Sequence, residues 1–101
     1  KSLVSGVHYT SSKAGLIGLT RQLAQELGPK GININCVCPS QTLTPMLKRS
    51  MTGLQLNALE NNIPLRRVAQ VSEVVKPILF LCSDDASYIH GACLDVNGGQ
   101  L

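Results

Sequence analysis

The chain has 101 residues, of which 44% are hydrophobic, 15% charged and only 3% aromatic, and its formal net charge at pH 7 is +3. This composition excludes a disordered or fibrous chain, and the positive excess is too small and too scattered to indicate a nucleic-acid partner. No apolar run approaches the roughly 20 residues that a membrane helix needs, so we expect no membrane segment. Because the chain starts at Lys1 and not at Met, we expect that it was cut, processed or taken from a longer reading frame, and since it shows no signal peptide we expect it to be cytoplasmic.

The cysteines, at positions 36, 38, 82 and 93, are interpreted as reduced structural thiols. Neither His8 nor His90 lies at zinc-finger spacing from the pair Cys36 and Cys38. A tetrahedral metal site needs four placed ligands. The sequence therefore predicts no metal site.

The first predicted element is a helix over residues 8–27, in which leucines recur with helical spacing between positions 16 and 27. The Gly-Pro pair at 28–29 is expected to end this helix. Gly15 and Gly18 lie inside it, and each costs up to about 1 kcal/mol relative to Ala. We therefore expect a reason for them, such as close backbone packing.

Alternating apolar residues over Ile32–Cys38 predict a strand that ends at Pro39. Residues 40–64 are mixed, and short helical pieces are predicted around Met46–Met51 and Leu54–Leu59. This segment separates the strand from the second main helix.

That second main helix is predicted over residues 73–82, with Ser72 as its N-cap and Glu73 favourable in its first turn. Pro77 removes a backbone hydrogen bond inside it, so we expect a bend there. A second strand is predicted over Ala92–Val96, and the Asn-Gly-Gly that follows closes it.

A strand, a helical crossover and a second strand form a βαβ unit, which is parallel and right-handed in nearly all proteins. Two parallel strands do not make a stable sheet alone. The order of helix, strand, helical lid, helix and strand therefore predicts one flank of a doubly wound α/β domain.

Tyr9 and Lys13 stand four residues apart at the start of the first helix, which places them on one helix face. A neighbouring ammonium lowers the pKa of a phenol from about 10, because the positive charge favours the phenolate. Such a tyrosine can exchange a proton with a substrate hydroxyl or carbonyl oxygen. On its own, however, a Tyr–Lys pair is most often a solvated helix face.

The pair belongs to a series of motifs: Tyr9-Thr-Ser-Ser-Lys13-Ala-Gly, Gly31-Ile-Asn-Ile-Asn-Cys-Val, Thr44-Pro-Met, Leu79-Phe-Leu-Cys-Ser-Asp, Ser87-Tyr-Ile-His-Gly and Val96-Asn-Gly-Gly. In order and spacing, this series closely resembles the short-chain dehydrogenase/reductase family over almost the whole chain. The resemblance implies that residues 1–101 form a single partial domain. It would be the C-terminal flank of a Rossmann-type parallel sheet, without the N-terminal dinucleotide-binding half.

The resemblance implies an NAD- or NADP-dependent oxidoreductase that interconverts an alcohol and a ketone. Tyr9 would be the catalytic acid/base. Lys13 would lower the pKa of Tyr9 and hold the nicotinamide ribose, so both residues would also contact the cofactor.

Further residues match the family's stretch beside the nicotinamide: Pro39, Ser40, Thr42 and Thr44. Ser40 stands where the family usually has Gly, which tolerates closer cofactor approach. Without the resemblance, the hydroxyls of Thr42 and Thr44 are interpreted as ordinary turn caps. The pair Arg66-Arg67 is interpreted as a solvated surface pair.

The glycine-rich phosphate turn and the catalytic serine of the family have no counterpart in this chain. We therefore expect no turnover and no tight cofactor binding by the chain alone. A second interpretation is a non-catalytic truncated or split module that acts through the family's oligomer interfaces. The resemblance implies a homodimer or homotetramer, in which the helix bearing Tyr9 and Lys13 makes intersubunit contacts.

Overall fold

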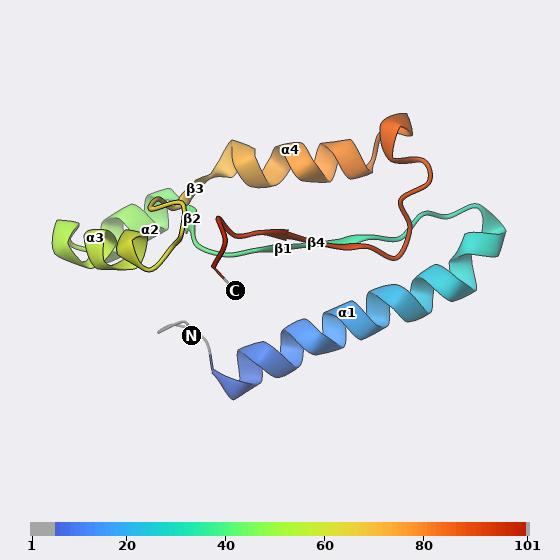
Figure 1. Ribbon diagram of the computed structural model, residues 1–101, viewed down its shortest axis with the longest axis horizontal. Helices are drawn as coiled ribbons and strands as arrows, with labels where there is room; N and C mark the ends of the chain where they lie inside the picture. Colours follow the sequence, from blue (N-terminus) through green and yellow to red (C-terminus); the bar gives the residue numbers. More distant parts are fainter. Residues whose placement is uncertain (1–5, 101) are drawn as a thin grey trace.

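The structure is a computed structural model in which residues 6–100 are described (Figure 1). The helices are α1 (Val7–Leu27), α2 (Pro45–Ser50), α3 (Gly53–Asn61) and α4 (Val71–Leu81). The strands are β1 (Cys36–Pro39), β2 (Thr42–Leu43), β3 (Ala69–Gln70) and β4 (Cys93–Val96). Short 3₁₀ turns at Gly28–Lys30 and Asp84–Ala86 follow α1 and α4.

β1 and β4 pair in parallel, with Cys36 opposite Cys93 and Pro39 opposite Val96. α1 lies along one face of this pair and α4 along the other (Figure 1). The predicted α/β fold class and the parallel βαβ unit are therefore confirmed. A second parallel pairing, β2 with β3, was not predicted, because a two-residue bridge leaves no periodic pattern in the sequence.

α1 begins and ends within one residue of its predicted range, but its apolar stripe is only partly covered. Leu16 and Leu19 remain 45% and 55% exposed. The close packing expected at Gly15 and Gly18 is absent from the described residues, since a Cβ at either position would meet nothing within 4 Å. Their small size therefore has no explanation inside residues 6–100.

The first strand is shorter than predicted, because residues 33–35 bond to the loop before β4 and Ile32 bonds to the end of α1. The Asn35 side-chain amide donates to the carbonyl of Ile89 at 3.0 Å, and its oxygen accepts from the backbone of Ala92 at 2.9 Å. A side chain therefore occupies the backbone groups that a continued ladder would have used. The ladder begins only at Cys36.

α4 begins at Val71, so the predicted N-cap at Ser72 is wrong. Gln70 is the N-cap, and its backbone N–H donates to the Glu73 carboxylate at 2.9 Å. Glu73 lies in the first turn, as predicted. The helix continues through Pro77 to Leu81.

The buried core is small and aliphatic. Its largest fully buried side chain is Ile63, at 1% exposure. Gly98, at a φ of +61°, places its backbone so close to Ile63 that a Cβ there would lie 2.9 Å from Ile63 Cγ2. The carbonyl of Gly98 also accepts from the N–H of Leu65 at 3.1 Å. The Asn-Gly-Gly turn thus packs the end of β4 against the segment that follows α3.

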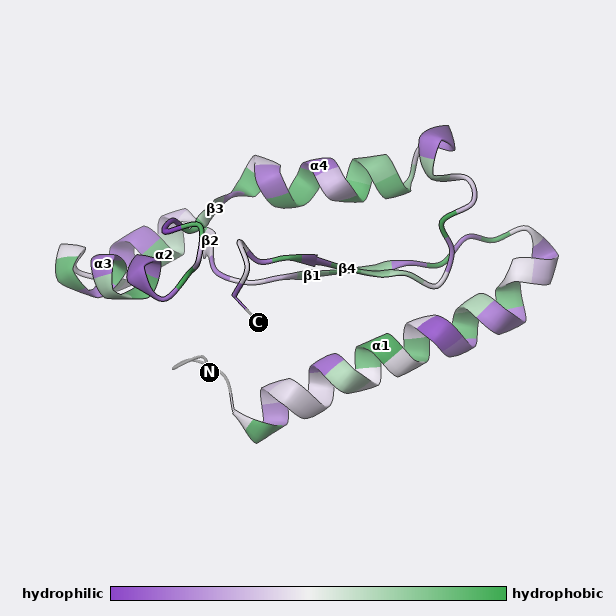
Figure 2. Ribbon diagram, viewed as in Figure 1, coloured by the Kyte–Doolittle hydropathy of each residue, from purple (hydrophilic) through white to green (hydrophobic). Residues whose placement is uncertain are grey.

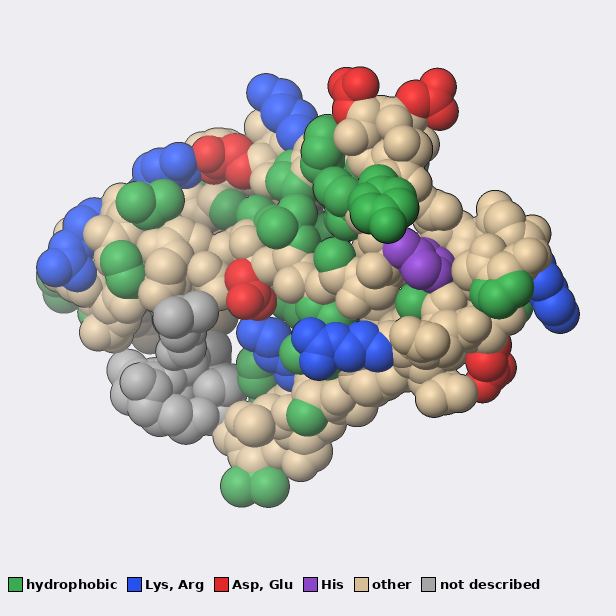
Figure 3. Space-filling model, turned by 45° about the vertical axis from the view of Figure 1, so that its right-hand side comes forward, with side chains coloured by type: hydrophobic (Ala, Val, Ile, Leu, Met, Phe, Trp, Pro, Cys, Tyr) green, Lys and Arg blue, Asp and Glu red, His purple; other side chains and the backbone are tan. Residues whose placement is uncertain are grey.

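Much of the apolar surface stays exposed, above all on α4, whose ribbon is largely hydrophobic (Figure 2). Leu79 is 63% exposed and Phe80 45% exposed. Hydrophobic side chains, drawn in green, gather around α4 on the face that Figure 3 shows. No helix within residues 6–100 has the length and apolar character that crossing a membrane requires.

Candidate active site

Tyr9 and Lys13 line a hollow of about 310 Å³ between the first half of α1 and β1. The other lining residues are Ser12, Leu16, Val37, Cys38 and Pro39. Helical spacing aims the two polar side chains of α1 at the same space, and β1 supplies the opposite wall. Tyr9 is 45% exposed, so its hydroxyl can reach a ligand from solvent.

Lys13 has a partner that the sequence interpretation missed. Its ammonium donates to Asp95 Oδ1 of β4 at 3.2 Å. This hydrogen bond is the largest cause of a raised pKa of Lys13, which burial opposes and the charge of Asp95 reinforces. The only sequence signal was a charged residue within a predicted strand.

The residues predicted to lie beside the cofactor divide between two places. Pro39 lines the hollow with Tyr9, whereas Ser40 lines a second hollow of about 520 Å³ at the carboxyl ends of β1 and β4. The Thr42 hydroxyl donates to the carbonyl of Ser40 at 3.4 Å. The Thr44 hydroxyl accepts from the backbone of Leu47 at 3.1 Å and caps α2.

Both threonine hydroxyls therefore have the local partners that ordinary turn chemistry provides. Neither Thr42 nor Thr44 lines the hollow that contains Tyr9.

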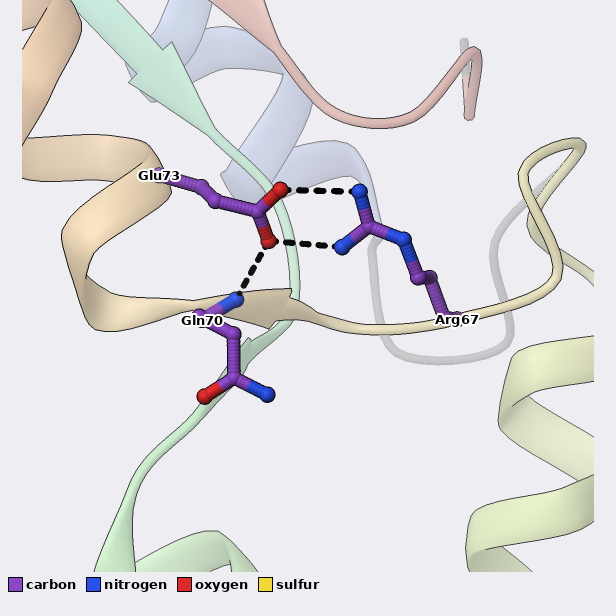
Figure 4. Close-up of polar contacts among 3 residues, drawn as sticks. All are labelled: Arg67, Gln70 and Glu73. Atoms are coloured by element: carbon purple, nitrogen blue, oxygen red, sulfur yellow. Dashed lines mark hydrogen bonds and ion pairs between the residues drawn. The ribbon is translucent and has the colours of Figure 1, made fainter.

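The second hollow includes a paired arginine. Arg67 donates to both carboxylate oxygens of Glu73, at 2.6 and 2.8 Å (Figure 4). The hydrogen bond from Arg67, followed by the one from the backbone of Gln70, lowers the pKa of Glu73 to about 2. Arg66 is exposed and donates to the carbonyl of Asn61. The two arginines are exposed as expected, but each has a partner within the chain.

The cysteines are free thiols. Cys36 and Cys93 are register partners, and Cys38 lies two residues beyond Cys36 on the same strand face. Burial raises the pKa of Cys38, and burial together with a hydrogen bond to Cys36 raises the pKa of Cys93 to about 11. Within residues 6–100, no three His, Cys, Asp or Glu side chains are arranged to hold a metal ion.

A family model described as enoyl-(acyl carrier protein) reductase matches residues 2–100. The chain belongs to the short-chain dehydrogenase/reductase family. This assignment confirms the resemblance carried by the motifs from Tyr9 to Gly99, and it places the chain in a family of oxidoreductases.

Relatives of different names share this similarity. The chain is 45% identical over 96 residues to the protein FixR of Bradyrhizobium diazoefficiens, covering 95% of this chain and 33% of FixR. It is 45% identical over 93 residues to the 3-oxoacyl-[acyl-carrier-protein] reductase FabG of Pseudomonas aeruginosa, covering 92% and 37% of the two chains. It is 38% identical over 100 residues to the acetoacetyl-CoA reductase of Rhizobium meliloti, covering 99% and 42%.

A solved structure has the same fold. The crystal structure of ribose-5-phosphate isomerase from Brucella melitensis 16M superposes with a TM-score of 0.82 at 41% identity, covering 91% of this chain and 36% of that one. This chain therefore spans between a third and about two fifths of the length of the curated relatives described above.

Proposed function

We propose that this chain carries the proton-transfer part of an NAD(P)-dependent oxidoreductase that interconverts an alcohol and a carbonyl compound. The observation that carries this proposal is the shared hollow, which Tyr9 and Lys13, one helical turn apart on α1, line opposite β1. The names of two relatives, both reductases of acyl thioesters, support a carbonyl substrate.

The donors in the hollow suit one end of the cofactor. The Tyr9 hydroxyl and the two N–H bonds of the Lys13 ammonium that Asp95 does not engage can meet the hydroxyl oxygens of a nicotinamide ribose. Pro39, which lines the same hollow, supplies apolar surface for the ring. A pyrophosphate needs a glycine-rich turn at a helix N-terminus. The sequence contains no such turn, so these residues fit the nicotinamide end alone.

When bound, the nicotinamide supplies or accepts a hydride at the substrate carbon. In the direction of reduction, the Tyr9 hydroxyl gives its proton to the carbonyl oxygen, and a phenolate remains on Tyr9. The positive charge of Lys13 stabilises that phenolate by Coulomb attraction. In the direction of oxidation, the phenolate takes the proton from the substrate hydroxyl.

A second candidate is a non-catalytic module that acts through its surface. The observation that favours it is the exposed apolar area on α1 and α4, including Leu19 at 55% and Leu79 at 63% exposure. Exposed patches of this kind drive association, and a two-fold homodimer is the commonest closed solution. Light scattering over a dilution series tests this candidate: a stable mass near 10.8 kDa at micromolar concentration would contradict it.

The enzyme proposal is tested with a chimera, in which the matched segment of the Pseudomonas reductase is replaced by the residues of this chain. We expect the chimera to oxidise NADH or NADPH in the presence of a 3-oxoacyl thioester. The 101-residue chain alone should neither turn over nor bind either cofactor tightly in a calorimetric titration. A folded chimera without activity, beside an active parent reductase, would contradict the proposal.

A further inference from the structure

Asp95 is a charged residue on a strand face that a helix covers. Side chains alternate along a strand, so Asp95 shares its face with Cys93, and in the parallel register it lies opposite Cys38. Cys38 is 6% exposed and lines the hollow with Tyr9 and Lys13. A carboxylate at this position needs a physical reason, because apolar residues normally fill the space between a sheet and its helix.

The reason is its contact with Lys13, 82 residues earlier in the chain. The ammonium lies 3.2 Å from Asp95 Oδ1, and the side chains of Lys13 and Asp95 are 33% and 46% exposed. An ion pair with this much solvent contact contributes little to folding stability. The ion pair has a larger effect on the orientation of the Lys13 side chain and on its ammonium group, because a lysine side chain otherwise has many rotamers and a strongly hydrated head group.

Three groups face the Lys13 ammonium from the elements around it: Asp95 from β4, Cys38 from β1 and Tyr9 from α1 itself. Burial raises the pKa of the Cys38 thiol. Asp95 is the carboxylate of this set, and it is the group that accepts a hydrogen bond from the ammonium. A single hydrogen bond to Asp95 leaves two N–H donors of Lys13 available for other partners.

We propose that Asp95 is a positioning residue for the proposed reaction: it holds the Lys13 ammonium at the sheet side of the hollow, next to Tyr9. This inference rests on the proposed function for its catalytic meaning. The contact itself is a property of the chain. Asp95 lines the second hollow and not the one that contains Tyr9, so in the proposed reaction it acts through Lys13.

The first experiment needs only the 101-residue chain. The side-chain resonances of Lys13, assigned with a Lys13→Arg variant, are followed by NMR through an alkaline titration. We expect Asp95→Asn to lower the pKa of Lys13, whereas the matched control Asp85→Asn, at an exposed site in the turn after α4, leaves it unchanged.

Two results, one from this titration and one from circular dichroism, would overturn the inference. One is a Lys13 titration that is the same in the Asp95→Asn variant and in the unaltered chain. The other is a loss of helical circular dichroism in Asp95→Asn at neutral pH, because Asp95 would then be required for the fold and not for Lys13.

The second experiment uses the active chimera. We expect Asp95→Asn to lower kcat and to move the alkaline limb of the pH profile of kcat to lower pH. Asp95→Glu should return this limb to its position in the unaltered chimera. A uniform loss of kcat at every pH, equal in both variants, would indicate a merely structural role. The two proposals can fail separately. If Asp95→Asn lowers the pKa of Lys13 in the 101-residue chain but the chimera stays active after Tyr9→Phe, the proposed function is wrong and the contact between Asp95 and Lys13 stands.

Discussion

The imidazole of His90 joins the end of α1 to the loop before β4. Its Nε2 lies 2.7 Å from the carbonyl oxygen of Ala24, and its Nδ1 accepts from the backbone N–H of Ile34 at 3.1 Å. Since Nδ1 is an acceptor, the proton is on Nε2, which donates to Ala24. The ring lies so close to Gly28 that a Cβ there would be 2.8 Å from Nε2. One side chain therefore fixes the helix, the extended segment and the loop together.

Replacement of His90 by Ala is expected to destabilise the chain by roughly 1 to 2 kcal/mol, because two hydrogen bonds to backbone groups are lost. His8, an exposed histidine in the first turn of α1, is the matched control, and His8→Ala should change stability little. Urea denaturation followed by circular dichroism measures both. Equal midpoints for the two variants would contradict the linking role of His90.

Replacing glycine by alanine is expected to change the folding stability in opposite directions at Gly18 and at Gly98. Gly18 faces open space inside a helix, so Gly18→Ala should stabilise the isolated chain by about 0.5 to 1 kcal/mol. Gly98→Ala should destabilise it, by about 1 to 2 kcal/mol from the left-handed backbone alone and further from the contact with Ile63.

Thermal unfolding of both glycine variants checks these signs. Destabilisation by Gly18→Ala, with a concentration-dependent midpoint in the unaltered chain, would instead indicate that a second copy packs against this face of α1.

The Glu73 carboxylate makes the folding stability of the chain depend on pH in the acid range. Its pKa falls from the usual 4.5 to about 2 in the folded chain, mainly because Arg67 donates to it. A lowered pKa in the folded state means that this contribution is present above pH 4.5 and is lost as the pH falls through 2. The difference in stability between the unaltered chain and Glu73→Gln should therefore shrink over that range.

This prediction is measured by urea denaturation at several pH values, with Asp85→Asn as the exposed control. Both Arg67 and Glu73 are solvent-exposed, so added salt should weaken the effect. A difference that stays constant between pH 6 and pH 2 would contradict the assignment.

Local signals in the sequence predicted the helices well. The leucine spacing of α1 and the Gly-Pro stop at 28–29 depend on residues within a few positions of one another, and so do the short helices that became α2 and α3. The N-cap of α4 was misplaced by two residues, because Ser72 is the usual cap type, whereas the cap is Gln70, whose N–H bonds to Glu73.

The parts that could not be predicted depend on residues far apart in the chain. The shortened first strand results from bonds between Asn35 and a loop more than 50 residues later. The contact between Lys13 and Asp95 spans 82 residues. For the candidate site, the motif therefore predicted Tyr9 and Lys13 but gave no indication of the carboxylate that directs the lysine.

In the proposed reaction Tyr9 transfers the proton, and two tyrosine variants of the active chimera test this role most directly. Tyr88 is fully exposed, so Tyr88→Phe is the matched control. We predict that Tyr9→Phe lowers kcat for carbonyl reduction by about 100-fold or more, because no other group replaces the hydroxyl proton, while Tyr88→Phe retains the kcat of the chimera. A Tyr9→Phe chimera with near-normal kcat would contradict the account.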